Sequence, residues 1–171
     1  MNQLLEFRKD KDEFFASDPD SPLTDDQKIS FTGLKYFPDN PALRLTVQVD
    51  EFPEKETIQM QTTANEIQTY KRFGRFQFSM EGQTASLTIY ASEDGFFLPF
   101  VDSLANTETY PAGRYLEPEF IGKGKFHIDF NRAYNPYCAY NEGWSCPITP
   151  FENRLKFLVF LSAVFVFTVG K

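Results

Sequence analysis

The feature that most constrains the fold is a series of short segments in which apolar and polar residues alternate. The clearest segment is 43–50, where Leu43, Leu45, Val47 and Val49 are separated by polar side chains. A period of two places successive side chains on opposite faces, as in a strand with one buried face. The same pattern recurs in residues 57–61, 75–80, 84–91 and, less regularly, 96–100. Because short turns and no helix separate these segments, we predict a mainly β domain, an antiparallel sandwich or barrel, rather than a parallel α/β sheet.

Two local signals refine this prediction. Glu81, Gly82 and Gln83 form a short glycine-containing loop between two alternating segments, which is typical of a hairpin. Pro99 lacks a backbone N–H, so the strand that contains it is expected at a sheet edge or a bulge. Aromatic residues make up 17% of the chain, with 20 Phe among its 171 residues, and this weighting favours a sheet over a helix bundle.

The N-terminal residues have a different character. A loosely amphipathic helix is predicted between Leu4 and Phe15, ending before the Ser17-Asp18-Pro19 turn, and Thr24 could cap one further short helix. A chain of 171 residues is expected to form one core. We therefore divide it into an N-terminal helical segment (1–28), a β domain (29–155) and an apolar tail (156–171).

Charge and cysteine content limit the class of partner and the cellular compartment that we expect. The net charge is −7, and residues 1–28 contain eight acids against four bases. An acidic surface argues against a nucleic-acid partner, whose phosphates require basic residues. Two cysteines are too few for a disulfide scaffold, and no secretory signal is visible at Met1. The expected localisation is cytoplasmic.

The apolar tail has three interpretations. As a helix, residues 155–169 would span about 22 Å, which is short of the roughly 30 Å hydrocarbon core of a membrane. Its Val, Phe and Thr content favours one or two buried strands. The alternatives are a shallow membrane anchor, so that membrane contact is expected only if the tail is exposed, and an altered ending such as a shifted reading frame.

Polar side chains concentrate near residues 125–131. If this segment is a strand, then His127, Asp129 and Asn131 share one face, opposite Phe126, Ile128 and Phe130. Asn135-Pro136 then breaks the strand and begins an irregular, Tyr-rich loop, and loops at strand ends commonly hold functional sites. The alternative is that these polar residues only face water.

Several motifs together resemble a known family. They are Glu108 to Leu116 (ETYPAGRYL), Asp129 to Tyr140 (DFNRAYNPYCAY), Cys146-Pro147 and Glu152 to Leu155 (ENRL), together with the earlier segments Arg8 to Phe15, Gly33 to Phe37 and Phe97 to Phe100. They resemble the bacterial and archaeal family called domain of unknown function 1684, over roughly residues 1–155. The family has no assigned activity to carry over. The resemblance implies that a site lies among the polar residues of these motifs: Arg114, Tyr115, Asp129, Asn131, Tyr134, Asn135, Cys138 and Glu152.

The thiol and metal chemistries open to these residues are limited. Seven residues separate Cys138 from Cys146 and the chain has a single histidine, His127, so no zinc site and no other metal centre is predicted. Asp129, Asn131, Asn135 and Glu142 could supply oxygen ligands to a hard cation, but they do not fit a calcium loop. Cys138 with His127 is a weak candidate for a catalytic dyad. A Cys138 to Cys146 disulfide is sterically allowed, but a cytoplasmic setting disfavours it.

Two functions remain open from the sequence. In the first, the protein binds a small anionic or polar molecule: Arg114 holds an anionic group, Asp129 and Glu152 act as acid or base, and Asn131 and Asn135 orient the ligand. Tyr115, Tyr134 and Cys138 complete this site, and the Tyr and Trp side chains could form an aromatic wall. In the second, the protein is a non-catalytic module whose polar signature residues form an internal stabilising network, for instance with Arg114 paired to Asp129. The sequence names neither a cofactor nor an oligomeric state.

Overall fold

The computed structural model describes residues 3–80 and 82–157. Two helices precede the strands, and short 3-10 turns join the later elements. The helices are α1 (Gln3–Ser17) and α2 (Asp25–Ser30), and the 3-10 turns are η1 (Pro41–Leu43), η2 (Phe130–Arg132), η3 (Tyr137–Ala139) and η4 (Phe151–Asn153). The strands are β1 (Arg44–Gln48), β2 (Asp50–Glu51), β3 (Thr57–Gln61), β4 (Ile67–Met80), β5 (Gln83–Ser92), β6 (Gly95–Phe100), β7 (Arg114–Leu116), β8 (Glu119–Gly122) and β9 (Lys125–Asp129).

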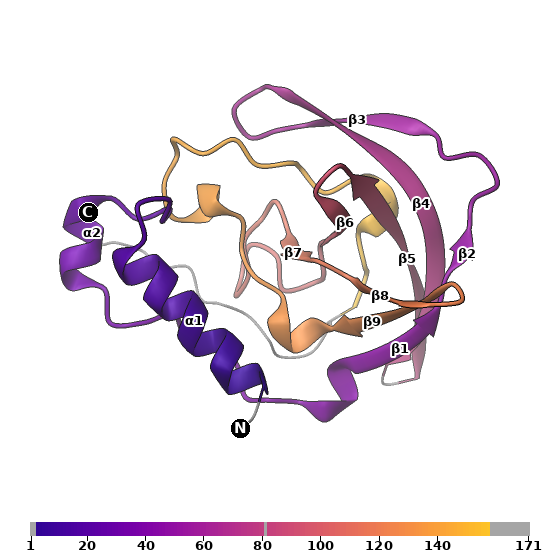
Figure 1. The fold of residues 1–171 in the computed structure, drawn as a ribbon, viewed down its shortest axis with the longest axis horizontal. Helices are drawn as coiled ribbons and strands as arrows, with labels where there is room; N and C mark the ends of the chain where they lie inside the picture. The colour runs from indigo at the N-terminus through magenta and orange to yellow at the C-terminus, as the bar shows by residue number, and fades with distance from the viewer. Residues whose placement is uncertain (1–2, 81, 158–171) are drawn as a thin grey trace.

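The described strands form two antiparallel sheets. The smaller sheet has the order β1-β9-β8, and the larger has the order β2-β4-β5-β6-β7 with β3 added to β4. Neither sheet closes into a barrel, and both helices lie to one side of the strands (Figure 1). The predicted mainly β antiparallel fold with an N-terminal helix is therefore confirmed.

The main core fills the space between the two sheets. Val47 of β1 and Phe126 of β9 come from the smaller sheet, while Phe76 of β4 and Leu87 of β5 come from the larger one. These side chains occupy alternate positions along their strands, so the period of two in the sequence corresponds to one face turned towards the other sheet.

The hairpin and Pro99 lie at the positions that we predicted from the sequence. β4 pairs with β5 from Lys71↔Ala91 to Met80↔Gln83, across the predicted glycine-containing turn. Pro99 pairs with Tyr115 of β7 in a part of β6 that has already separated from β5. The side that lacks an N–H therefore has no strand partner, as the sequence indicated for an edge.

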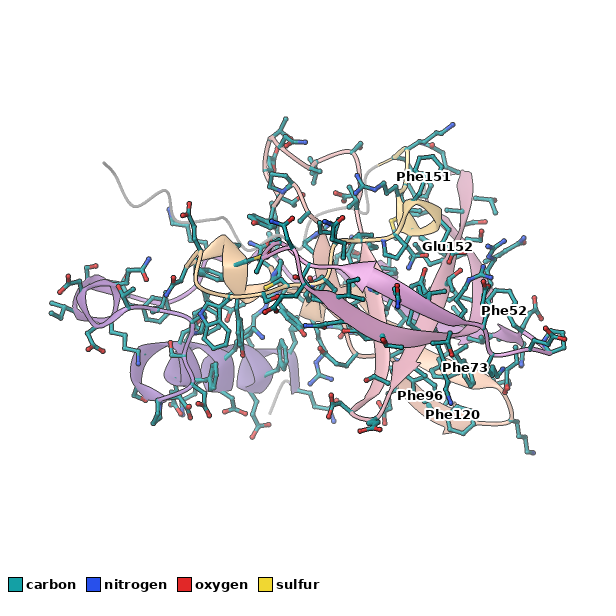
Figure 2. The ribbon with its side chains drawn as sticks, turned by 90° about the horizontal axis from the view of Figure 1, so that it is seen from above. Phe52, Phe73, Phe96, Phe120, Phe151 and Glu152 are labelled. Atoms are coloured by element: carbon teal, nitrogen blue, oxygen red, sulfur yellow. The ribbon has the colours of Figure 1, made fainter. Side chains whose placement is uncertain are left out.

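Many of the phenylalanines close one end of the core. Phe96 and Phe126 have ring centroids 4.8 Å apart, and Phe73 and Phe120 pack on the same pair at 4.8 to 6.3 Å. Phe73, Phe96 and Phe120 lie close together at the end of the sheets far from the helices (Figure 2). Four of the 20 phenylalanines thus seal this end of the interface between the sheets.

The N-terminal segment packs beside the loop that follows β9. α1 ends at Ser17, the first residue of the predicted turn, and Thr24 caps α2 through a reciprocal pair of hydrogen bonds with Gln27. Phe15 is 1% exposed and has ring contacts with Tyr137 and Tyr140 of that loop, at 6.2 and 5.0 Å. α1 thereby becomes one wall of the region in which the family-like motifs lie.

The end of β9 differs from the prediction. β9 ends at Asp129 and Asn131 lies in η2, so the expected alignment of His127, Asp129 and Asn131 on one strand face is wrong: the chain turns after Asp129.

The three interpretations of the apolar tail concern residues that lie almost entirely outside those described. None of the described helices is long and apolar enough to cross a membrane.

Candidate functional site

A pocket of about 400 Å³ lies between α1 and the loop after β9. α1 contributes Phe7 and Lys11, the β7 region contributes Tyr115 and Glu117, and the rest of the lining comes from the loop, including Tyr134, Tyr137, Trp144 and Cys146. We call this the aromatic pocket. Its volume is within the range that encloses a small organic molecule.

The loop that forms the pocket is anchored to the sheet by backbone and side-chain hydrogen bonds. Tyr115 and Tyr134 exchange backbone N–H to carbonyl bonds of 2.8 and 3.1 Å, and their rings meet edge to face. The Tyr115 hydroxyl donates to the Pro147 carbonyl. Two further rings of the lining, those of Tyr137 and Trp144, pack edge to face at 5.0 Å. The walls are therefore preformed rather than dependent on a ligand.

Lys11 is the distinctive charged group of the pocket. Its Nζ atom lies 3.9 Å from the centre of the Tyr134 ring, and burial lowers the pKa of the amine to about 8 against the opposing effect of Glu117. Within residues 3–80 and 82–157 Lys11 makes no hydrogen bond and no ion pair. The Tyr134 hydroxyl donates to the Glu117 carboxylate, so the pocket holds a cation and an acceptor side by side.

Glu152 lies outside the aromatic pocket and has no capacity left for a ligand. Arg72 donates to both of its oxygens at 3.0 and 2.7 Å, and Arg75, Thr88 and Tyr90 donate at 3.0, 3.0 and 2.7 Å. Burial alone would raise the pKa of this carboxyl, but the hydrogen bonds from Arg72, Tyr90 and Thr88 outweigh it and hold the pKa at about 2. Glu152 joins η4 to the outer face of β4 and β5, and its position beside exposed Phe151 is shown in Figure 2.

Asp129 and Asn131 fix the turn at the end of β9. One Asp129 oxygen accepts from the backbone N–H and the side-chain amide of Asn131, at 3.0 and 2.7 Å, and the other lies 3.5 Å from Arg44 Nε. The Asn131 side chain also binds the N–H and the carbonyl of Asn40, both at 2.9 Å. These contacts connect the turn to β1 and to the segment before it.

Arg114 is placed in the interior rather than at a ligand site. Its side chain is 2% exposed, donates to Asp102 at 2.7 Å and stacks on Phe100 with 4.8 Å between the guanidinium carbon and the ring centre. The pairing that the sequence suggested, Arg114 with Asp129, is wrong, because Asp102 takes that place and Arg44 pairs with Asp129. Burial lowers the pKa of Arg114, and the Asp102 carboxylate opposes the change.

The remaining motif residues lie near the aromatic pocket. Tyr115 and Tyr134 line it, whereas Asn135 is buried behind it and hydrogen-bonds Tyr140. Cys138 lies next to Cys146 in a cluster with Tyr115. The structure thus brings Tyr115, Tyr134 and Cys138 together and separates them from Glu152.

Sequence reasoning missed Lys11, Glu117 and the pocket position of Cys146. For Lys11 a signal was present: Leu4, Lys11 and Phe15 are spaced by seven and four residues, which places them on one face of a helix. Leu4 and Phe15 are buried, so Lys11 is a lysine within an apolar stripe. No comparable signal marks Glu117, because its role depends on the approach of Tyr134.

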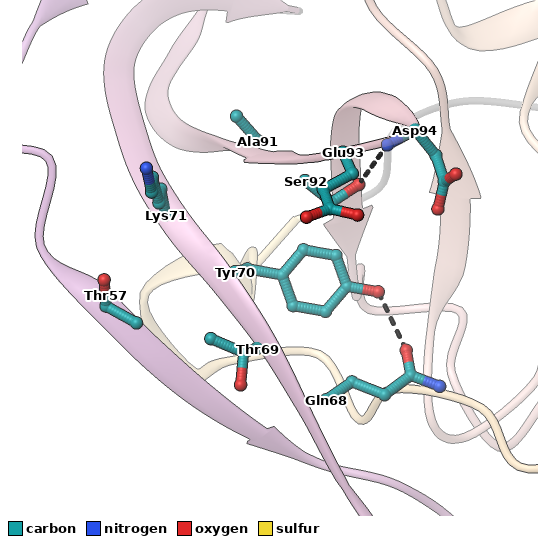
Figure 3. Close-up of a pocket in the computed structure, with 9 residues that line it drawn as sticks. All are labelled: Thr57, Gln68, Thr69, Tyr70, Lys71, Ala91, Ser92, Glu93 and Asp94. Atoms are coloured by element: carbon teal, nitrogen blue, oxygen red, sulfur yellow. Dashed lines mark hydrogen bonds between the residues drawn. The ribbon is translucent and has the colours of Figure 1, made fainter.

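A second hollow, of about 560 Å³, lies where β4 separates from β5 (Figure 3). Tyr70 stacks on Phe97 at 5.2 Å and donates to Gln68, while Lys71, Glu93 and Asp94 on its rim are exposed. Charged groups that are already in water gain little from a ligand. Among the described residues, no three His, Cys, Asp or Glu side chains converge as a metal site would require. The aromatic pocket is therefore the stronger candidate.

Comparisons with known proteins agree with the fold and add no activity. Residues 29–160 match the model of the family described as protein of unknown function (DUF1684). The chain is also similar to the solution NMR structure of an uncharacterized protein from Haloarcula marismortui, with 30% identity, a TM-score of 0.74, and coverage of 97% of this chain and 94% of that one. None of the curated proteins matches the chain.

Proposed function

Because the chain belongs to the DUF1684 family, which is described only as being of unknown function, we propose its role from the geometry: it binds a small molecule with a planar ring and an anionic group in the aromatic pocket. The observation that carries the proposal is the Lys11 ammonium group. It is half-buried at the pocket wall and makes no hydrogen bond within the described residues. A carboxylate or phosphate of a ligand would supply the missing acceptor.

The aromatic walls indicate the other part of the ligand. Tyr134, Tyr137 and Trp144 offer ring faces and edges, which favour a flat ring over a flexible aliphatic chain. Glu117 accepts from Tyr134 and has a further lone pair for a hydroxyl or amino group of the ligand. The pocket therefore suits a ring acid that also carries a hydrogen-bond donor.

The proposal is for binding, since the carboxylates expected to act as acid and base have other roles. Glu152 is saturated by its basic and hydroxyl partners, and Asp129 holds the turn after β9. These contacts, with the buried Arg114–Asp102 pair, favour the second function for part of the signature: an internal network that fixes the loop. The two roles are compatible, because the network supports the walls of the pocket.

The only tryptophan of the chain, Trp144, lines the pocket and reports directly on its occupancy. We would titrate the protein with benzoate and phenyl phosphate, with benzamide and benzyl alcohol as uncharged controls, and follow Trp144 fluorescence. Saturable changes are expected with the two anions and not with the uncharged rings.

Variants of two lysines on the same helix test the role of Lys11. Lys11→Gln should weaken anion binding at least about tenfold, equivalent to about 1.4 kcal/mol. Lys9→Gln is the matched control, because Lys9 is 74% exposed and paired with Glu13. Equal binding by the two variants, equal binding of charged and uncharged rings, or no saturable change with any ring acid would refute the proposal.

A further inference from the structure

The aromatic pocket has two thiols in and behind its wall. Cys138, in η3, and Cys146 are both free and buried, and both contact the cluster around Tyr115. The backbone N–H of Cys138 donates to Cys146 Sγ at 3.2 Å. The two cysteines are 8 positions apart in the sequence but adjacent in space, so a disulfide between them would close a short loop.

Both thiols are held on fixed backbone. Thr63 binds Cys146 on both sides: its hydroxyl accepts from the Cys146 N–H at 3.1 Å, and its own N–H donates to the Cys146 carbonyl at 2.9 Å. Cys138 lies within a 3-10 turn closed by the Ala139 N–H to Pro136 carbonyl bond of 2.9 Å. Their proximity is therefore built into the fold and is not the product of a mobile loop.

The pair also has the acidity that thiol oxidation requires. The hydrogen bond with Cys146 lowers the pKa of the Cys138 thiol to about 6 against the effect of burial, and the same contact raises the pKa of the Cys146 thiol. Thiolate, rather than thiol, is the reactive form. Cys146 lines the pocket, and Cys138, which lies next to it, is 9% exposed against 6% for Cys146, so a small oxidant that enters the pocket reaches the pair.

We propose that Cys138 and Cys146 are a redox modification site, which hydrogen peroxide converts into a reversible disulfide. The Cys138 thiolate attacks one oxygen of hydrogen peroxide, the O–O bond breaks, and hydroxide leaves and takes up a proton to become water. The Cys146 sulfur then attacks the Cys138 sulfenic acid, the S–O bond breaks, and a second water leaves with the Cys146 proton. The thiols lose two electrons in total and the peroxide gains them. This inference does not depend on the ring ligand.

A disulfide of this kind is compatible with a reducing compartment, in which disulfides are transient and redox-sensing. If the pair were only structural, as small buried apolar residues, the thiols would not react with each other. A disulfide between Cys138 and Cys146 is therefore the product that distinguishes a redox site from a structural pair of thiols.

Peptide mapping detects that bond directly. Trypsin cleavage after Arg132 and Arg154 releases both cysteines in one peptide, and cleavage after Glu142 divides that peptide between them. After treatment of the protein with hydrogen peroxide, the tryptic peptide should lose two hydrogens, about 2 Da. Its halves should then stay joined after cleavage at Glu142 until a reductant is added.

Single variants identify the order of attack. Cys146→Ser should accumulate a sulfenic acid on Cys138 that dimedone traps, and Cys138→Ser should give at least about tenfold less adduct on Cys146. Melting curves establish that each variant is folded, and if one is not, the linkage of the halves in the unmodified protein decides. Two thiols that stay unlinked, or equal trapping in the two variants, would overturn the proposal.

Discussion

Glu152→Gln separates a structural carboxylate from a catalytic one, because it removes the charge with almost no change in shape. In the folded protein Glu152 accepts hydrogen bonds from Arg72, Arg75, Thr88 and Tyr90. A glutamine offers one acceptor oxygen and turns an amide NH₂ towards groups that are themselves donors. The variant should therefore lose stability.

The pKa of Glu152 gives the size of the effect. Its ordinary value is 4.5 and its value in the folded protein is about 2, so at about 1.4 kcal/mol per pH unit the charge contributes roughly 3 kcal/mol at neutral pH. The side chain is 25% exposed, and solvent screening reduces this figure to about 2 to 3 kcal/mol. Because the pKa of the folded state is the lower one, the contribution is complete above about pH 4.5 and is lost as the pH falls towards 2.

Denaturant unfolding of both proteins between pH 7 and pH 2 measures this contribution. The free energy of unfolding of Glu152→Gln should be about 2 to 3 kcal/mol lower at pH 7, and the two proteins should converge near pH 2. Glu56→Gln is the control, since Glu56 contacts the same Arg72 at 3.2 Å but is 64% exposed and should cost less than about 1 kcal/mol. An effect no larger than that of the control, or one independent of pH, would refute the reasoning.

Three further predictions follow from the contacts described above. Asp129→Asn should lower the free energy of unfolding by about 1 to 3 kcal/mol in denaturant unfolding, because it weakens the bonds that close the turn onto Asn131 and Arg44; an unchanged stability would contradict the structural role. Arg114→Met should cost about 3 to 5 kcal/mol by leaving Asp102 buried without its ion pair, and adding Asp102→Asn should recover part of the loss in a double-mutant cycle. Binding of phenyl phosphate should weaken as the pH rises through about 8, because Lys11 loses the charge that attracts the anion; a flat profile from pH 7 to 9 would show that Lys11 is not the counterion.

Much of the fold could be predicted from the sequence because one face of each sheet is buried. Alternation in β1, β4 and β5 records which side chains face the other sheet, and the turn after β4 has its own chemical signature. The alternating pattern predicts a strand over residues 125–131, two residues longer than β9, which ends at Asp129. The apolar side chain of Phe130 continues the alternation, but the Asp129 side chain caps η2 and turns the chain.

The candidate site was less predictable because a polar residue in a motif looks the same whether its partners are in the protein or in a ligand. Asn153 illustrates the problem. It is fully buried within the Glu152 to Leu155 motif, and its amide binds the backbone N–H and carbonyl of Thr88 and the carbonyl of Pro99, each at 2.8 Å. It bridges β5 and β6 at the point where the strands separate, which no local sequence pattern reveals. Motif membership therefore indicated the right regions and could not assign roles within them.

What distinguishes Lys11 from these residues is the balance between its burial and its partners. Glu152 and Asn131 are enclosed and their hydrogen-bonding capacity is filled, which is the state expected of groups that stabilise a fold. Lys11 is half-buried, yet in the described structure its ammonium group meets only the Tyr134 and Phe7 rings and the field of Glu117. An ammonium group held in this way raises the free energy of the empty protein and lowers it again when an anion enters. Addition of such an anion should therefore raise the melting temperature of the protein, and should do so less for Lys11→Gln, which links the energetics of the fold to the proposed binding.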